Sequence, residues 1–249
     1  MPDETEIKLK IRDLKAFQRI LKRLGAKPVG SATGRVHEEN LIFDTPDGGL
    51  AKHGQLLRLR TETMAIAVAK KSSKPKKAKK SRKPAPAAAA KSSTLTRQIL
   101  TFKRPTAEQA AAPTSRYPSF GSHKVREEIE AHVTDSANLI KIFEGLGMRG
   151  WFRYEKYRTT YQLPAIKSWA RGLLIEVDET PIGTFVELEG PPAAIDRAAT
   201  ELGYSKRDYI LTNYLALYVE DCRRKGQQPQ NMLFPNKISL KLLPKSSHS

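Results

Sequence analysis

The chain has 249 residues, of which 39% are hydrophobic and 28% charged, so it is long enough for one large domain or two small ones. No apolar stretch approaches the ~20 residues that a bilayer-spanning helix needs, which excludes a membrane-spanning protein. The start, MPDETEIKLKIRDLK, lacks the apolar run of a secretory signal, and the single cysteine, Cys222, cannot form an intramolecular disulfide. Together these features predict a cytoplasmic protein.

The net charge of +18 comes from 44 basic and 26 acidic residues, and most of it lies in two places. Residues 70–83, KKSSKPKKAKKSRK, contain nine basic side chains and no acid, and the tail 221–249 contains six basic residues and one acid. The rest of the chain therefore carries only +4. We interpret 70–83 either as a solvated linker or as a segment that binds nucleic acid or polyphosphate non-specifically through its charge.

In chain order, alternation of apolar and polar residues predicts eight strands, and helical periodicity predicts four helices. The strands are expected at 4–11, 36–44, 55–61, 97–104, 123–133, 151–163, 172–178 and 184–190. The helices are expected at 13–24, 135–146, 192–202 and 208–224. Residues 70–93 are mainly Lys, Pro, Ala and Ser, which cannot bury enough apolar surface to offset the entropy of ordering. We therefore predict a disordered insertion at 70–93, a long loop at 107–120 and a basic tail at 221–249 whose pattern is loose from residue 226.

An internal repeat relates the first two predicted helices. Asp13 and Gly25 bound the first helix, and Asp135 and Gly147 stand 122 residues later around the second. Each half thus reads as a strand, an Asp-capped helix and further strands. Two similar halves of four strands each predict one α+β domain over residues 1–220, an eight-stranded antiparallel β-barrel with flanking helices, interrupted by the insertion.

The polar members of the predicted strands are charged to an unusual degree. One such strand alone indicates a solvated surface. Seven strands with the same pattern favour a polar tunnel, because a barrel directs every second side chain into its lumen. The expected lumen cations are Lys8, Arg58, Arg60, Lys103, Arg126, Lys156 and Arg158. The expected lumen carboxylates are Glu4, Glu6, Glu128, Glu130, Glu176, Asp178, Glu187 and Glu189.

So many enclosed charges need partners. Arginine and lysine donate hydrogen bonds to phosphate oxygens, and arginine does so in a bidentate way. Clustered carboxylates without cysteine or paired histidine suit hard divalent cations such as Mg²⁺ or Mn²⁺. The expected guest of the tunnel is therefore a metal-bound polyanion.

Several motifs carry a resemblance to a known family. Glu4 to Lys8, ETEIK, fits an ExExK signature, and FDTPDGGLAKHGQLLRLR, LTFKRP, REEIE, EKYR and VELEG follow in order. In these elements the chain resembles the CYTH superfamily, named for class IV adenylyl cyclases and thiamine triphosphatases. The resemblance covers roughly residues 2–220 and implies a triphosphate tunnel and a divalent metal. The long insertion departs from the family pattern, in which this connection is often short.

Carried over by position, the resemblance implies roles for the lumen residues. The metal-binding carboxylates would be Glu4, Glu6, Glu187 and Glu189, and the seven lumen cations would bind the phosphates. Glu128, Glu130, Glu176 and Asp178 would hold a second metal or orient the cations. Lys156 is the predicted catalytic residue, orienting or deprotonating the nucleophile, because lysine changes its charge state with its surroundings whereas Arg158 stays charged.

The resemblance implies an enzyme that acts on a triphosphate, in one of two reactions. A class IV adenylyl cyclase converts ATP to cyclic AMP and pyrophosphate, and a triphosphatase hydrolyses tripolyphosphate, thiamine triphosphate or a nucleotide. A third hypothesis is a non-catalytic polyphosphate or nucleic-acid binder. The expected partner is a small triphosphate, with no membrane, and the pattern leaves a homodimer open.

Overall fold

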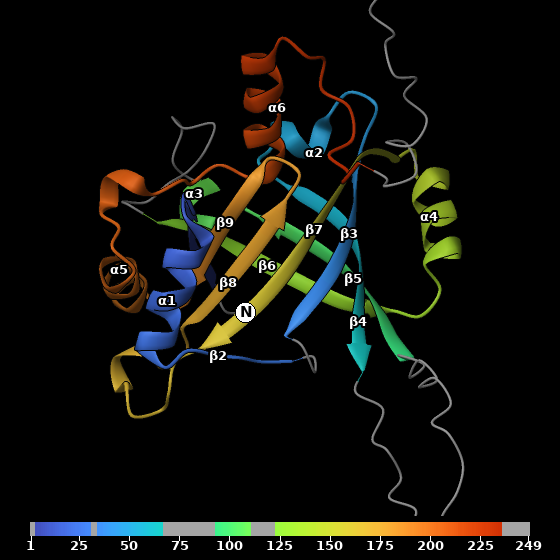
Figure 1. The fold of residues 1–249 in the computed structure, drawn as a ribbon. Coiled ribbons are helices and arrows are strands. Elements are labelled where there is room, and N and C mark those ends of the chain that lie inside the picture. Colours follow the sequence, from blue (N-terminus) through green and yellow to red (C-terminus); the bar gives the residue numbers. More distant parts are fainter. Residues whose placement is uncertain (1–2, 31–33, 67–92, 111–122, 236–249) are drawn as a thin grey trace, which may run out of the picture.

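The computed structural model describes residues 3–30, 34–66, 93–110 and 123–235 (Figure 1). Within these ranges eight strands form a closed antiparallel barrel, in the order β7-β3-β4-β5-β6-β1-β9-β8, which closes through pairing of β7 with β8. The strands are β1 (Asp3–Lys10), β3 (Arg35–Asp44), β4 (Leu56–Ile66), β5 (Ser93–Arg104), β6 (Lys124–Val133), β7 (Arg149–Gln162), β8 (Leu174–Thr180) and β9 (Gly183–Glu189). The predicted α+β barrel is confirmed, with one addition, the short strand β2 (Lys27–Pro28), which pairs with β7.

The apolar faces of the strands point outward, toward the helices, and the charged faces point inward. Ile7 and Leu9 of β1 are buried in the same outer cluster as Phe17 and Leu21 of helix α1 (Leu14–Leu24). Helix α5 (Pro192–Glu201) packs into this cluster through Ile195. Much of the hydrophobic core therefore lies between the barrel wall and the helices. A further buried cluster, which includes Phe152, Phe185 and Tyr214, lies on the same strand faces as the charged residues and fills the end of the barrel beneath the last helix.

A second outer cluster lies over the opposite wall, where helix α4 (Ser136–Gly145) packs against β3, β4 and β5. Asp13 caps α1 by accepting a hydrogen bond from the Ala16 amide at 3.0 Å, and Asp135 caps α4 by accepting one from the Asn138 amide at 3.0 Å. Matching caps support the internal repeat. Each of the two helices packs on strands of the other half, since α1 shares its cluster with β8 and β9 and α4 packs on β3, β4 and β5.

The last helix starts later than the sequence predicted. Lys206–Asp208 is a 3₁₀ turn with a reciprocal capping box between Ser205 and Asp208. The chain then pairs with β1, where Ile210 and Lys8 exchange backbone hydrogen bonds of 3.1 and 2.8 Å. Helix α6 (Tyr214–Lys225) begins only after this pairing, so the prediction of a helix from residue 208 is wrong at its start.

The remaining elements are short. They are α2 (Gly49–Lys52), α3 (Ala107–Ala110) and a 3₁₀ turn at Ser168–Ala170. Helix α3 opens the stretch predicted as a loop at 107–120, and the rest of that stretch lies outside the described residues. Nearly all of the predicted insertion 70–93 lies outside them too, apart from Ser93, which begins β5. None of the helices in the described ranges is both long and apolar enough to cross a membrane.

Candidate active site

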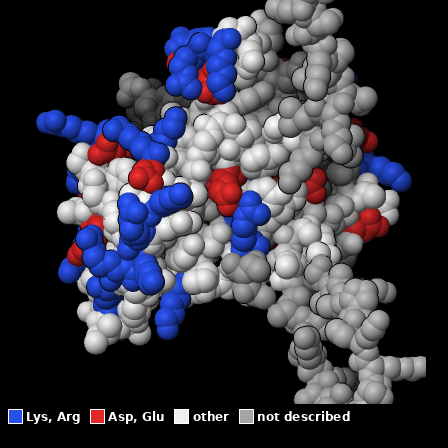
Figure 2. All heavy atoms as spheres, in the orientation of Figure 1, with Lys and Arg blue, Asp and Glu red and all other residues white. Residues whose placement is uncertain are grey.

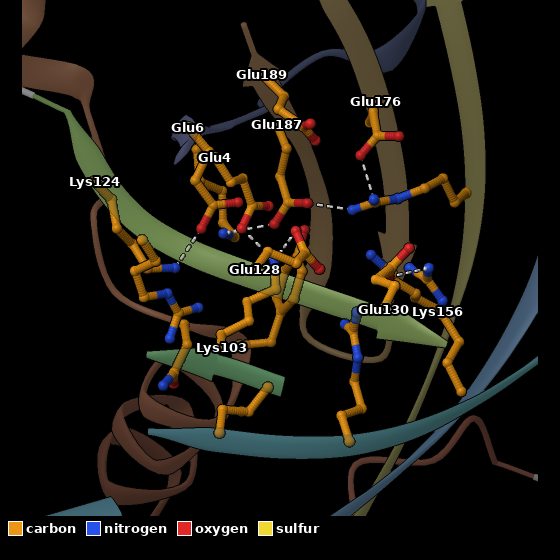
Figure 3. Close-up of a pocket in the computed structure, with 18 of the residues that line it drawn as sticks. Glu4, Glu6, Lys103, Lys124, Glu128, Glu130, Lys156, Glu176, Glu187 and Glu189 are labelled. Carbon is orange, nitrogen blue, oxygen red and sulfur yellow. Dashed lines mark hydrogen bonds and ion pairs between the residues drawn. The ribbon is translucent and has the colours of Figure 1, made fainter. Parts of the chain in front are cut away.

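The lumen contains a cavity of about 210 Å³ lined by strands β1 and β4 to β9 and by the start of α6 (Figure 3). All seven cations expected in the lumen line it, namely Lys8, Arg58, Arg60, Lys103, Arg126, Lys156 and Arg158. Seven of the eight expected carboxylates line it as well, namely Glu4, Glu6, Glu128, Glu130, Glu176, Glu187 and Glu189. The eighth, Asp178, has 0% of its surface exposed and lies behind Lys156 and Arg158.

Strand register places opposite charges side by side on neighbouring strands of the barrel. Lys8 of β1 stands opposite Glu187 of β9, and their side chains form an ion pair of 2.7 Å. Arg158 of β7 stands opposite Asp178 of β8 and binds it through two nitrogen atoms at 2.7 Å. Period-two alternation thus selects the residues, and closure of the barrel selects their partners.

Two cations of β7, Lys156 and Arg158, are paired with buried carboxylates. The Lys156 ammonium lies 2.9 Å from Asp178 Oδ2 and 3.4 Å from Glu38 Oε2. Arg158 also contacts Glu176 and Glu187. Burial and the neighbouring Arg158 act to lower the pKa of Lys156, but the surrounding carboxylates outweigh them and raise the pKa above its ordinary value. Lys156 is therefore a cation here, which suits orientation of a nucleophile better than deprotonation.

The carboxylates of β1 and β9 gather on one side of the lumen, across from Lys103 and Lys124 (Figure 3). Glu4 contacts Lys103, and Glu6 contacts Lys124. Burial alone would raise the pKa of Glu6, yet Lys124 and the neighbouring lysines hold it below its ordinary range. Each of these two carboxylates thus has an ammonium group as its counterion.

Glu189 is the exception among the four candidate metal ligands, since it forms no ion pair with any described residue. Burial, together with the charges of Glu176 and Glu4, raises its pKa to about 8. Burial raises the pKa of Glu4 as well, against the attraction of Lys103. Full ionisation of the carboxylates on this side of the lumen is therefore unfavourable without a further cation.

These carboxylates fit a hard divalent cation in their chemistry, because oxygen is the ligand such ions prefer. Among the described residues, however, no three carboxylate, histidine or cysteine side chains converge closely enough to hold a metal. Glu4, Glu6 and Glu187 are paired instead with Lys103, Lys124 and Lys8. A divalent cation would replace these ammonium groups as the counterion of the carboxylates.

Two arginines of the lumen lack a carboxylate partner within the described part of the chain. Arg58 donates only to the Tyr154 hydroxyl at 3.2 Å and to Thr101 at 3.4 Å. The Nε atoms of Arg58 and Arg126 are buried, and neither has a hydrogen-bond acceptor among the described residues. Buried donors without acceptors are costly, so these arginines favour a ligand that brings anionic oxygen atoms.

Sequence reasoning missed several lining residues. Lys124 lies on the same face of β6 as Arg126, so the alternation in KVREEIE could have identified it. Glu38 does not line the cavity but supports Lys156 from behind; it is 1% exposed and follows the same alternation on β3. Asn213 and Tyr214 enter the lumen from the start of α6, and no strand pattern could have revealed them.

A second cavity, of about 930 Å³, adjoins the first and shares Leu56, Lys124, Arg126 and Asn213 with it. Its other walls are largely apolar. They include Ile42, Phe43, Pro105, Trp151, Leu211, Leu215 and Val219. The polar lumen thus adjoins a space that could accept an organic group.

A comparison with protein families matches residues 3–212 to the CYTH domain. The chain belongs to the CYTH family. A comparison with curated protein sequences found no match. The resemblance suggested by the motifs is therefore confirmed, and the charged lumen described above is the lumen of a CYTH barrel.

Solved structures agree on the fold. A candidate adenylate cyclase from Vibrio parahaemolyticus is 15% identical, with a TM-score of 0.55 over 85% of this chain and 94% of its own. A protein from Pyrococcus horikoshii is 16% identical, with a TM-score of 0.57 over 88% and 98% of the two chains. A conserved hypothetical protein from Pyrococcus furiosus is 22% identical, with a TM-score of 0.53 over 86% and 99%.

Proposed function

We propose that this CYTH protein is a divalent-metal-dependent enzyme that converts ATP to cyclic AMP and pyrophosphate. The observation that carries the proposal is the lumen itself, where arginines without carboxylate partners share one cavity with a cluster of carboxylates that includes Glu189, which has no ion pair within the described residues. A triphosphate with a divalent cation supplies both missing partners. A simple anion-binding protein would gain nothing from the added carboxylates, which disfavours the non-catalytic alternative.

The proposed roles follow from the charge of each lumen group and from its place in the family motifs. Glu4, Glu6, Glu187 and Glu189 would hold Mg²⁺ or Mn²⁺, and the metal would neutralise charge on the phosphate oxygens. The phosphate ligands would be Lys8, Arg58, Arg60, Lys103, Arg126, Lys156 and Arg158. Asp178 and Glu176 bind Lys156 or Arg158 directly, which supports an orienting role for them rather than a second metal site. For Glu128 and Glu130 we retain both proposed roles, which are to hold a second metal or to orient the lumen cations.

In the proposed reaction the ribose 3′-hydroxyl attacks the α-phosphorus. The new oxygen–phosphorus bond forms as the bond to the β-phosphate breaks, pyrophosphate leaves, and the proton of the hydroxyl passes to solvent water. Lys156 would orient the hydroxyl and stabilise negative charge at the reacting phosphorus, since it is held as a cation. The apolar cavity beside the lumen supports a nucleoside triphosphate, because the adenosine needs a partly apolar site outside the charged lumen.

The alternative is a triphosphate phosphohydrolase, in which water attacks the terminal phosphorus. The size of the lumen favours it, because a cavity of about 210 Å³ lined almost wholly by charges accommodates a phosphate chain more readily than a whole nucleotide. Inorganic tripolyphosphate and thiamine triphosphate are the substrates of this alternative.

A substrate panel separates the two reactions. The purified chain is incubated with ATP, tripolyphosphate or thiamine triphosphate in Mg²⁺ or Mn²⁺, and cyclic AMP and orthophosphate are measured separately. Cyclic AMP from ATP is the expected result. Orthophosphate without cyclic AMP would establish the hydrolase instead, and binding without any product would favour the non-catalytic alternative.

A further inference from the structure

Helix α6 is fastened to the barrel at both ends, although it lies outside the matched CYTH domain, which ends at residue 212. Before the helix, Ile210 pairs with Lys8 of β1. After it, the Met232 amide donates to the Arg153 carbonyl at 2.9 Å, and the Glu155 amide donates to the Met232 carbonyl at 3.0 Å. These contacts with β1 and β7 set the position of the first helical residue, Tyr214, against the lumen.

Tyr214 contacts the charged lumen through both its hydroxyl and its ring. The side chain is 7% exposed, and its hydroxyl donates to Asp178 Oδ2 at 2.7 Å. The ring centre lies 4.5 Å from the Lys8 ammonium and 5.4 Å from the Lys156 ammonium. One side chain of α6 therefore contacts a carboxylate and two cations that belong to three different strands.

Asp178 is the point at which these contacts meet. It is fully buried and accepts one hydrogen bond from Lys156 and two from Arg158, all from the neighbouring strand β7. The hydroxyl of Tyr214 belongs to α6, which is not part of the sheet, and it donates a fourth hydrogen bond to Asp178 from within the lumen. A carboxylate held from two directions has one orientation, and the cations that bind it share that orientation.

We propose that Tyr214 is a positioning residue of the active site, which holds Asp178 and through it sets Lys156 and Arg158 for the phosphate chain. Helix α6, which follows the residues matched to the CYTH domain, is then a part of the catalytic unit. The inference rests on the proposed function for the identity of the ligand, but the contacts themselves do not depend on it.

Two variants test the proposal on the full-length chain. Tyr214→Phe removes the hydroxyl and keeps the ring, which packs 5.6 Å from Phe185. Tyr218→Phe is the matched control, because Tyr218 lies one turn further along α6 and its hydroxyl donates to the Asn231 carbonyl at 3.3 Å, outside the lumen. Circular dichroism and thermal melting show whether each variant is folded.

The first measurement is the Kd for inorganic tripolyphosphate in Mg²⁺, by calorimetry. We expect Tyr214→Phe to raise the Kd about tenfold, the usual effect of losing a hydrogen bond to a charged group, and Tyr218→Phe to leave it within twofold. In an Asp178→Asn background the added effect of Tyr214→Phe should nearly vanish, since Tyr214 acts through Asp178.

The second measurement needs no ligand. Solvent exchange of the Arg158 Nε–H, followed by nuclear magnetic resonance, should be faster in Tyr214→Phe than in the wild type and unchanged in Tyr218→Phe. Unchanged exchange in Tyr214→Phe, an equal change in the control, or full additivity with Asp178→Asn would overturn the proposal. If the wild type does not bind tripolyphosphate, the proposed function fails, and the exchange measurement still decides the role of Tyr214.

Discussion

At the scale of single residues, Lys156 and Arg158 are neighbours in the lumen with different expected roles. Lys156 is a compact ammonium 2.9 Å from Asp178, whereas Arg158 spreads its charge over Asp178, Glu176 and Glu187. A guanidinium in place of Lys156 keeps the charge but cannot place it at the same point. We therefore expect Lys156 to orient the nucleophile and Arg158 to bind the phosphate chain.

We predict that Lys156→Arg retains triphosphate binding but loses most of its turnover, about a hundredfold. Arg158→Ala should mainly weaken binding, because it removes a bidentate donor. Steady-state kinetics give kcat and KM, and calorimetry gives the Kd for both variants. Wild-type turnover by Lys156→Arg across pH 7 to 10 would remove Lys156 from the catalytic role.

The candidate metal ligands lead to a second residue-level prediction. Glu6→Gln preserves size but removes the charge that would balance a divalent cation, so the Mg²⁺ concentration for half-maximal activity should rise about tenfold or more. Glu127→Gln is the matched control. Glu127 lies on the outer face of β6, between the lumen residues Arg126 and Glu128, and pairs with Arg104. Unchanged activity of Glu6→Gln at limiting Mg²⁺ would contradict the metal assignment.

Glu189 leads to a prediction on stability in chelator-treated protein. Its pKa in the fold is about 8, above the ordinary 4.5, so between these values the folded chain keeps a proton that the unfolded chain has lost. Stability should therefore fall as pH rises from 5 to 8. Linkage alone gives about 3 kcal/mol, and solvent screening of this partly exposed side chain reduces the fall to about 1 to 2 kcal/mol. In Glu189→Gln this part of the slope should be absent. Urea unfolding of both proteins across this pH range measures the difference, and identical slopes would contradict the shift.

At the scale of elements, β4 and β5 are paired to their very ends, with Ile66 opposite Ser93. Both strands extend beyond their predicted limits, β4 past residue 61 and β5 before residue 97. The ends of the two strands are therefore already placed for a short hairpin turn, although 26 residues, 67–92, separate them in the sequence.

We predict that replacing residues 67–92 with an Asn-Gly turn leaves kcat and KM within about twofold, because a two-residue turn fits directly opposed strands. The full-length enzyme serves as the reference in the same assay. A folded deletion variant that has lost activity would show instead that the insertion takes part in catalysis.

At the scale of the whole molecule, the charge is distributed unevenly. Figure 2 shows lysine and arginine side chains gathered over α1 and at the end of α6, with acidic side chains among them. Lysines and arginines in residues 70–83 alone account for half of the net charge of +18. Non-specific electrostatic association with nucleic acid should therefore depend more on this segment than on the barrel.

The same deletion variant tests this expectation. Its affinity for duplex DNA should be lower, and the dependence of that affinity on salt should be less steep, because fewer counterions are released. Fluorescence anisotropy at several salt concentrations measures both quantities. An unchanged salt dependence would assign any binding to the barrel or to the tail instead.

Local pattern was sufficient for most of the architecture. All eight barrel strands follow period-two alternation, and Asp13 and Asp135 mark the two helices that repeat, because strand faces and helix caps depend on residues close together in the sequence. The same alternation selected Lys8, Arg58 and Glu187 as members of one charged face. Their family motifs then pointed to a triphosphate ligand.

What only the tertiary structure decided is which charges meet. Alternation is the same whether a charged face points into a lumen or into solvent, and pairing of β7 with β8 is what encloses it. The partners of Lys156, the raised pKa of Glu189 and the entry of Tyr214 from α6 all join residues far apart in the chain. No local pattern encodes such distances, because they arise from barrel closure and from the docking of the last helix.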